Sequence, residues 1–180
     1  MYQTLLAKLA RALESAGIPY MVIGGQAVLL HGEPRLTRDI DITLGIDNLA
    51  LEIVLQVAFS IGLLPTVGEI SKFVKKTNVL PLRDFPTQVR VDLIFSFTPY
   101  ESDAIRRSLI VEVAGARVRF AAAEDLIIHK LVAGRPRDLE DVKGVIARGV
   151  DLDEKYLEQW LGSFREVVNR DLVTEYRALK

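Results

Sequence analysis

Three carboxylates and a pair of glycines are the residues of this 180-residue sequence whose types and spacing could do chemistry. Asp39 and Asp41 lie two apart in an apolar run, so on a β-strand both side chains would leave the same face. Neighbouring carboxylates repel each other unless a cation lies between them, and Mg²⁺ takes such oxygen ligands together with substrate phosphates. Gly24 and Gly25 permit a tight turn and a close approach of backbone N–H groups to phosphate at a helix start. The combination indicates metal-assisted phosphoryl or nucleotidyl transfer.

The third carboxylate, Asp92, alternates with apolar residues in the run 88–95. An acid in such a strand is costly to bury without a counter-charge, which either a metal ion or a pairing with Arg90 would supply. Taken singly, a Gly-Gly pair is most often only a turn, and an Asp-x-Asp at a strand end is most often solvated. Their occurrence in this order, with thirteen residues between them, favours a functional site.

A family resemblance rests on the same residues. The order of a hydrophobic residue, Gly24-Gly25, a spacer and Asp39-Ile-Asp41 resembles the signature of the polymerase-β-type nucleotidyltransferase superfamily. The fuller pattern most resembles the AbiEii-type nucleotidyltransferases of bacterial toxin–antitoxin systems; its further members are His31-Gly32, Arg35, Thr37 and Arg38. The segment 124–142 resembles the second motif of those proteins, in which a lysine on one helix precedes an Arg-Asp-x-x-Asp sequence.

The resemblance implies transfer of a nucleoside monophosphate from an NTP to an acceptor hydroxyl, with Mg²⁺, expected as two ions, as the cofactor. The implied site residues are Asp39, Asp41 and Asp92 as catalytic and metal-binding acids, Gly24 and Gly25 for the β/γ-phosphates, Arg38 and Lys130 for phosphate charge, and Asp138 and Asp141 for ordering the basic residues. From the residues alone, the group around Lys130 is equally well a helix-capping cluster of ion pairs.

Several acceptors and partners are compatible with these motifs. The acceptor could be the 3′ end of a tRNA, as the toxin resemblance implies, a protein side chain, or a small molecule such as an aminoglycoside. The alternative from another class is a non-catalytic nucleotidyltransferase-like partner that binds an antitoxin or a helical companion; a plain Mg²⁺-dependent phosphohydrolase fits less well. Two departures from the family stand out: the chain is shorter than many AbiEii-type toxins, and Gly25 replaces a serine hydroxyl found in other superfamily members.

Periodicity indicates the elements that position these residues. We expect strands at 20–23, 39–44, 78–82, 88–95, 109–113 and 117–120, and helices at 3–16, 26–30, 49–61, 99–107, 122–133, 136–148, 154–168 and 171–179. The fold class is therefore α/β (α+β) of the nucleotidyltransferase type: a small, mixed, mostly antiparallel sheet flanked by helices, then a helical C-terminal portion. We predict a single domain, 1–180, with a catalytic core over about 1–121 and the helical portion over about 122–180.

Composition narrows the function classes. A net charge of −1 means that no overall basic field recruits nucleic acid, so contacts must come from local patches. Lys72, Lys75 and Lys76 form one such patch, although a solvated face explains them as simply. The absence of cysteine removes disulfides and thiolate chemistry. No signal-peptide pattern or membrane-length apolar run is present, so a cytoplasmic location is expected.

Overall fold

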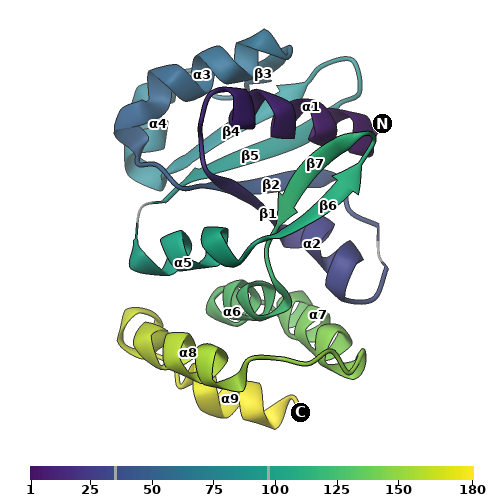
Figure 1. The fold of residues 1–180 in the computed structure, drawn as a ribbon. Coiled ribbons are helices and arrows are strands. Elements are labelled where there is room, and N and C mark those ends of the chain that lie inside the picture. Colours follow the sequence, from purple (N-terminus) through teal and green to yellow (C-terminus); the bar gives the residue numbers. More distant parts are fainter. Residues whose placement is uncertain (35, 97) are drawn as a thin grey trace.

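The computed structural model describes residues 1–34, 36–96 and 98–180, and within them seven strands form one sheet (Figure 1). The strands are β1 Tyr20–Ile23, β2 Asp39–Leu44, β3 Leu63–Pro65, β4 Val79–Asp84, β5 Val89–Phe95, β6 Leu109–Val113 and β7 Ala116–Phe120. The helices of the same described ranges are α1 Tyr2–Ser15, α2 Gly24–His31, η1 Asn48–Ala50 (a 3₁₀ turn), α3 Leu51–Ser60, α4 Ile70–Thr77, α5 Pro99–Arg107, α6 Ala123–Ala133, α7 Pro136–Ala147, α8 Glu154–Val168 and α9 Leu172–Ala178.

The sheet has the strand order β3-β4-β5-β2-β1-β7-β6. The pairs β1–β7 and β2–β5 are parallel, whereas β1–β2, β3–β4, β4–β5 and β6–β7 are antiparallel. The mixed, mostly antiparallel sheet predicted from the sequence is confirmed. Strand β2 occupies the centre, between β1 and β5, so the glycine pair after β1 and the acids on β2 and β5 lie on three adjacent strands.

One face of the sheet is covered by α1, α3 and α4 and contains much of the apolar core (Figure 1). The inward face of α1 carries Leu5, Leu6, Leu9 and Leu13, which are all buried, as their helical spacing predicted. Strand β5 follows a period of two, because every second residue from Val89 to Phe95 is buried and the residues between them, Arg90, Asp92 and Ile94, are not. The alternation turns Asp92 away from this core.

The opposite face supports α2, α5 and α6; α7 lies beside α6, and α8 and α9 pack against α6 on the side away from the sheet (Figure 1). Helix α6 buries residues around most of its circumference, including Leu126, Ile128 and Leu131, because it is held between the sheet and the other C-terminal helices. Trp160 and Phe164 of α8 pack edge-on against Tyr100 of α5, with ring centroids 5.2 Å apart in both pairs. Core packing therefore explains these two aromatic residues.

Two parts of the chain differ from the sequence prediction. The segment Leu63–Pro65 is an edge strand, β3, that the sequence analysis missed because three residues are too few to show alternation. Its proline sits at the edge of the sheet, where the missing N–H costs no ladder hydrogen bond. The segment 67–76, to which no element was assigned, becomes α4 and ends at Asn78 in the left-handed conformation.

None of the helices in the described ranges combines the length and apolar character needed to cross a membrane.

Candidate active site

The turn between β1 and α2 brings backbone against a carboxylate. Helix α2 begins at Gly24, two residues earlier than predicted, so both glycines lie in its first turn and not in a separate turn before it. A Cβ added to Gly24 would lie 2.9 Å from Cγ of Asp41, and one added to Gly25 would lie 2.8 Å from Cβ of Thr37. Gly24 also has a φ of +61°, which L side chains rarely adopt. Only glycine leaves both the space and the free N–H groups at this helix start.

The three acids lie on neighbouring strands and on one face. Asp41 pairs in register with Asp92 across the parallel β2–β5 ladder, and with Ile23 across the β1–β2 ladder. Asp39 precedes Asp41 by two residues and points to the same face, 4.0 Å from the Arg90 guanidinium. The observed strand register therefore places all three carboxylates beside the glycine turn.

Burial and mutual repulsion act on the same acids. Burial and, after it, the negative charges of Asp92 and Asp39 raise the pKa of Asp41 to about 6. Burial also raises the pKa of Asp92, against the opposing effect of Arg90. A cation bound between these neighbouring carboxylates would offset their repulsion and stabilise their ionised forms.

The donor set fits a divalent cation that is shared with a phosphate substrate. Within the described residues, no three His, Asp or Glu side chains are gathered as tightly as the ligands of one bare ion. Mg²⁺, however, usually takes one or two carboxylates and completes its octahedron with water and substrate phosphates. Asp41 and Asp92, aligned on adjacent strands, with Asp39 beside them, match that kind of site.

The wall opposite the acids comes from α6 and α7 and is built on buried ion pairs. Lys130 Nζ lies 2.8 Å from both Asp138 Oδ1 and Asp141 Oδ2, and all three side chains are buried. Asp138 Oδ2 accepts a hydrogen bond from Arg135 Nε at 2.6 Å and another from the Arg135 backbone N–H at 3.3 Å, and the second belongs to a capping box at the start of α7. Although burial raises the pKa of Asp138, hydrogen bonds from Arg135 and Lys130 hold it below its usual value. The Arg135 side chain itself is 74% exposed.

A cavity of about 580 Å³ lies between the two walls. Its sheet side is formed by the glycine pair and the acids, and its helix side by α6 and the start of α7. The lining residues that carry charge or a backbone cradle are Gly24, Gly25, Asp39, Asp41, Arg90, Asp92, Lys130, Arg135, Arg137 and Asp138. Carboxylates therefore face guanidinium groups across a space that would hold a small charged ligand.

Comparison with known proteins agrees with this geometry. The family described as “Nucleotidyltransferase of unknown function” (DUF6036) matches residues 4–177, nearly the whole chain. The chain belongs to this nucleotidyltransferase family. No curated protein matches the sequence significantly.

Solved structures show the same fold at low sequence identity. An antigenic nucleotidyltransferase-like protein from Paracoccidioides brasiliensis has a TM-score of 0.57 at 19% identity, over 99% of this chain and 92% of that one. The enzyme ANT(2″)-Ia, in complex with adenylyl-2″-tobramycin, has a TM-score of 0.58 at 16% identity, over 98% and 97%. The lincosamide antibiotic adenylyltransferase LnuA, with lincomycin bound, has a TM-score of 0.51 at 18% identity, over 74% and 89%. The fold is thus nucleotidyltransferase-like.

The structure brings most of the site residues predicted from the sequence together in one cavity. The three acids, both glycines, Lys130 and Asp138 all line the cavity. Asp141 is buried beneath Lys130, and Arg38 is exposed on the loop before β2, so neither is a lining residue. His31 is buried and its Nε2 donates to the Ala121 carbonyl oxygen at 2.7 Å, so it has a packing role and does not line the cavity. Arg35 lies outside the described residues.

Four further lining residues with basic or imidazole side chains were not assigned to the site from the sequence. Arg90 precedes Asp92 by two, so strand alternation could have placed it on the same face. Arg135 and Arg137 flank the proline that starts α7, but their direction depends on how α7 meets the sheet. Burial lowers the pKa of His129 to about 4, so its ring is neutral, and no sequence signal indicated its position in the wall.

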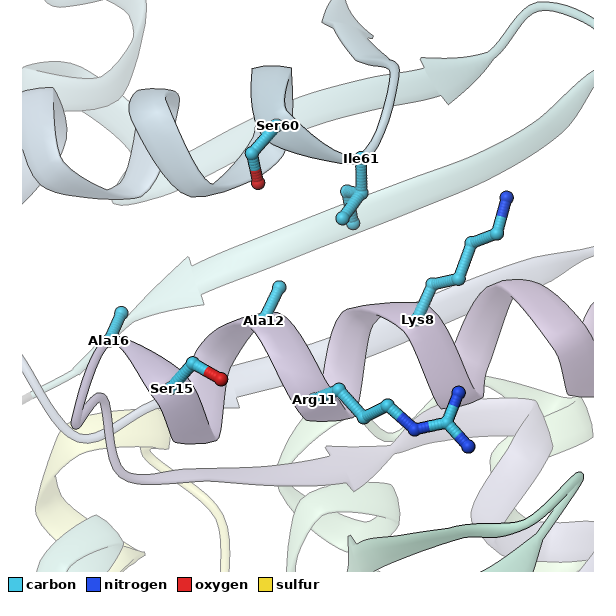
Figure 2. Close-up of a pocket in the computed structure, with 7 residues that line it drawn as sticks. All are labelled: Lys8, Arg11, Ala12, Ser15, Ala16, Ser60 and Ile61. Carbon is cyan, nitrogen blue, oxygen red and sulfur yellow. The ribbon is translucent and has the colours of Figure 1, made fainter.

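A second hollow, of about 530 Å³, lies away from the acids between α1 and the end of α3 (Figure 2). Lys8, Arg11 and Ser15 of α1 line it together with Ser60 and Ile61. The Arg11 guanidinium donates to the Gly115 carbonyl oxygen at 2.8 Å, so part of its charge already serves the β6–β7 turn. The described lining residues include no carboxylate, which leaves the first cavity as the candidate active site.

Proposed function

We propose that the protein transfers a nucleoside monophosphate from an NTP to an acceptor hydroxyl. One observation carries the proposal: Asp41 lies in the cavity between the Gly24 backbone and Asp92, with the guanidinium groups of α7 on the opposite wall. The Gly24 backbone and the guanidinium groups of α7 would bind the triphosphate, and Asp92 would contact the acceptor hydroxyl. Membership of a nucleotidyltransferase family supports the same reaction class.

The donor half of the site would bind the triphosphate. Gly24 and Gly25 present N–H groups of the first turn of α2, where the helix dipole favours phosphate. Asp39, Asp41 and Asp92 would hold Mg²⁺, which when bound supplies neutralisation of phosphate charge and a lowered pKa for the acceptor hydroxyl. Arg38 is a peripheral phosphate contact in this proposal.

Lys130 and Arg135, on the opposite wall of the cavity, have different roles. Lys130 already has two carboxylate partners at 2.8 Å, so we assign it to fixing α7 against α6 as well as to adding positive charge near the phosphates. Asp138 and Asp141 hold that lysine, and Asp138 also orients Arg135. The exposed guanidinium of Arg135 is then the group available to grip the triphosphate, since a planar fork suits phosphate oxygens.

The reaction follows from these positions. The acceptor hydroxyl oxygen attacks the α-phosphorus of the NTP, and its proton passes to the Asp92 carboxylate. The bond from the α-phosphorus to the bridging oxygen breaks, and pyrophosphate leaves beside the first turn of α2. Asp92 suits the base role because burial raises its pKa, which makes it a stronger base than an exposed aspartate.

The resemblance to AbiEii-type proteins supports a toxin of a toxin–antitoxin pair, acting on a tRNA 3′ end in the cytoplasm with an antitoxin as partner. The antibiotic adenylyltransferases among the structural neighbours point instead to a small-molecule acceptor and to ATP as the first donor to test. Incubation of the purified protein with tRNA and each NTP tests the first acceptor. We expect longer tRNA with the wild type and none with Asp39→Ala or Asp41→Ala. Retained transfer in either variant would contradict the mechanism.

A further inference from the structure

The two outer edges of the sheet differ in how open they are to a further strand. At one edge, β3 has three residues and ends in Pro65, and both features limit pairing. At the other edge lies β6, a five-residue strand without proline or lysine, on the outer side of β7 (Figure 1). Within the described residues, no strand pairs with the outer side of β6. This edge is therefore the one that is open to another strand.

The turn between β6 and β7 determines which backbone groups of β6 are free. The two turn residues, Ala114 and Gly115, both have positive φ angles, of +48° and +71°. A two-residue turn of this type closes on a hydrogen-bonded pair, and such pairs alternate with non-hydrogen-bonded pairs along the ladder. Counted from the turn, the first, third and fifth residues of β6 bond to β7. The N–H and C=O groups of Ile110 and Glu112 therefore point to the open edge.

The open edge is apolar and its position is fixed by α1. Leu109 and Ile110 are adjacent in sequence and are 46% and 43% exposed. The Arg11 guanidinium of α1 donates to the Gly115 carbonyl oxygen at 2.8 Å, which holds the turn after β6 in place. An exposed apolar edge strand of this kind is a template for pairing with another chain. Because the strand is already formed, little ordering opposes such pairing.

A second copy of β6 matches this edge residue for residue. The chain leaves the strand at α5 on one side and at the turn on the other, so the edge offers a ladder of five residues. In an antiparallel pair with Val111 on a two-fold axis, Ile110 of each copy lies opposite Glu112 of the other. The outward-facing residues of both copies then form two hydrogen-bonded pairs. A two-fold axis at Ile110 or at Glu112 would instead leave only three residues of β6 in the ladder.

The apolar side chains of β6 also fit this register. Val111 would lie directly opposite its own copy, and Leu109 would lie opposite Val113. Such cross-strand pairs of apolar residues are a main source of stability in sheets. One face of the junction is therefore apolar along its whole length.

The charges on the other face are balanced within each copy. Glu112 lies beside Arg117 in the β6–β7 register, and Ile110 lies beside Arg119. Arg119 Nε in turn lies 3.7 Å from a carboxylate oxygen of Glu14 on α1. The two Glu112 side chains would be diagonal neighbours, about 7–8 Å apart, and each has its own arginine. The register with Val111 on the axis therefore places no two like charges directly opposite each other.

We infer that β6 pairs with β6 of a second copy across a two-fold axis at Val111, so that two sheets join into one. The axis of an antiparallel pair is perpendicular to the sheet, so both cavities would open on the same face of the joined sheet. The described lining of the candidate active site includes no residue of β6 or β7, so pairing leaves the cavity open. Two five-residue strands make a smaller contact than a standard interface of about 1,600 Å², so the dimer is weak, with a Kd in the micromolar range.

Cross-linking tests the register directly, because the chain contains no cysteine and a single introduced thiol can link only to its copy. Residues opposite each other in a non-hydrogen-bonded pair have Cα atoms about 4.5 Å apart, within reach of a disulfide. Val111→Cys should therefore form a covalent dimer under mild oxidation. Ile110→Cys is the matched control at a neighbouring exposed position. Its copy would lie two residues along the strand, beyond the limit of about 7 Å, so it should link at least about fivefold more slowly on a non-reducing gel.

Sedimentation velocity tests the association without a cross-link. The mass of the wild type should rise from 20.1 kDa toward twice that value as its concentration increases through the micromolar range. Ile110→Pro removes an outward N–H but no bond to β7, so it should remain monomeric. Ile110→Thr keeps that N–H and should still dimerise. Circular dichroism shows whether both variants are folded.

Three results would each overturn the inference. The first is a wild type that stays at 20.1 kDa up to about 0.5 mM, which would leave this edge to a strand of a different protein. The second is cross-linking of Ile110→Cys as fast as that of Val111→Cys, which indicates random collision. The third is an Ile110→Pro dimer as tight as that of the wild type. The comparison of the two cysteine variants decides the matter even if the proline variant does not fold.

Discussion

Asp41 lies on the central strand, beside a glycine backbone on one side and Asp92 on the other. Burial and two neighbouring negative charges raise its pKa from 3.8 to about 6. The folded chain therefore binds a proton at this carboxyl more tightly than the unfolded chain does. Ionisation of Asp41 therefore destabilises the fold. This destabilisation is absent at low pH, begins as the pH rises above about 4 and is complete above about 6.

Replacing Asp41 with asparagine should therefore abolish transfer and stabilise the metal-free fold at pH 7.5. The gain is at most about 3 kcal/mol, from a shift of about two pKa units, and it should fade toward pH 4. Urea denaturation of both proteins across this range measures it. Asp151→Asn, on the exposed segment before α8, is the control. A variant that is less stable than wild type at pH 7.5 would show that Asp41 is not held in an unfavourable charge state.

Gly24 is the second residue whose chemistry depends on its surroundings. Gly24→Ala places a methyl group against Asp41 and forces a side chain into φ +61°, whereas Gly17→Ala forces the same conformation at φ +67° with nothing within 4 Å. Both variants should lose about 1–2 kcal/mol through backbone strain, and only Gly24→Ala should also lose Mg²⁺–NTP binding. Thermal melts and calorimetry on the pair separate strain from site geometry. Equal affinity of both variants for Mg²⁺–NTP would contradict the assignment of Gly24 to phosphate binding.

At the scale of elements, the junction of α6 and α7 depends on one lysine. Lys130→Met leaves Asp138 and Asp141 buried without that cation, and loss of one partner of a buried ion pair costs about 3–5 kcal/mol. Lys143→Met, an exposed lysine on α7, is the control and should change stability by less than about 0.5 kcal/mol. Chemical denaturation measures both. Equal stability of the two variants would mean that Lys130 does not hold the wall together.

The contact between α6 and α8 contains a fully buried acid, Asp125, whose pKa burial raises to about 6. Tyr156 donates its hydroxyl to Asp125 Oδ1 at 2.7 Å, and Arg107 lies 3.8 Å from Oδ2. The hydroxyl favours the charged form, so its removal penalises the carboxylate and not the neutral acid. Its contribution is therefore present above about pH 6 and fades below it.

Tyr156→Phe should cost about 1–3 kcal/mol at pH 8, where Asp125 is ionised, and clearly less at pH 5. Urea midpoints at the two pH values give the comparison. Tyr2→Phe, a tyrosine on α1, serves as the control and should show no such pH dependence. If the loss were larger at pH 5, Asp125 would have to be ionised there, contrary to its burial.

At the scale of the whole molecule, local patterns predicted most of the elements and part of the acid group. Alternation in β2 placed Asp39 and Asp41 on one face, since a period of two is a property of any strand. The place of Asp92 beside them depends on the β2–β5 register, and only the family resemblance implied it. The residues of the opposite wall of the cavity were harder to predict from the sequence. How α7 meets the sheet depends on the packing of α6 between α2, α8 and α9, which are distant in sequence, so the exposed guanidinium of Arg135 could not be placed.

The same reasoning explains what was missed at the edge of the sheet. β3 owes its existence to pairing with β4, with Leu63 opposite Asp84, and not to its own three residues. Without β3 the sheet would end at β4, so the width of the sheet beside Asp92 could not be predicted from the sequence. The division into a core and a helical C-terminal portion within a single domain stays a prediction.

Calorimetric titration with each NTP, with and without Mg²⁺, on the wild type, Asp41→Asn and Asp151→Asn tests the central claim most directly. We predict Mg²⁺-dependent binding of at least one NTP to the wild type and to Asp151→Asn, and none to Asp41→Asn, although that variant is folded. Binding that persists in Asp41→Asn would contradict the assignment of the site. No binding of any NTP to the wild type would contradict the reaction itself and favour a non-catalytic partner domain.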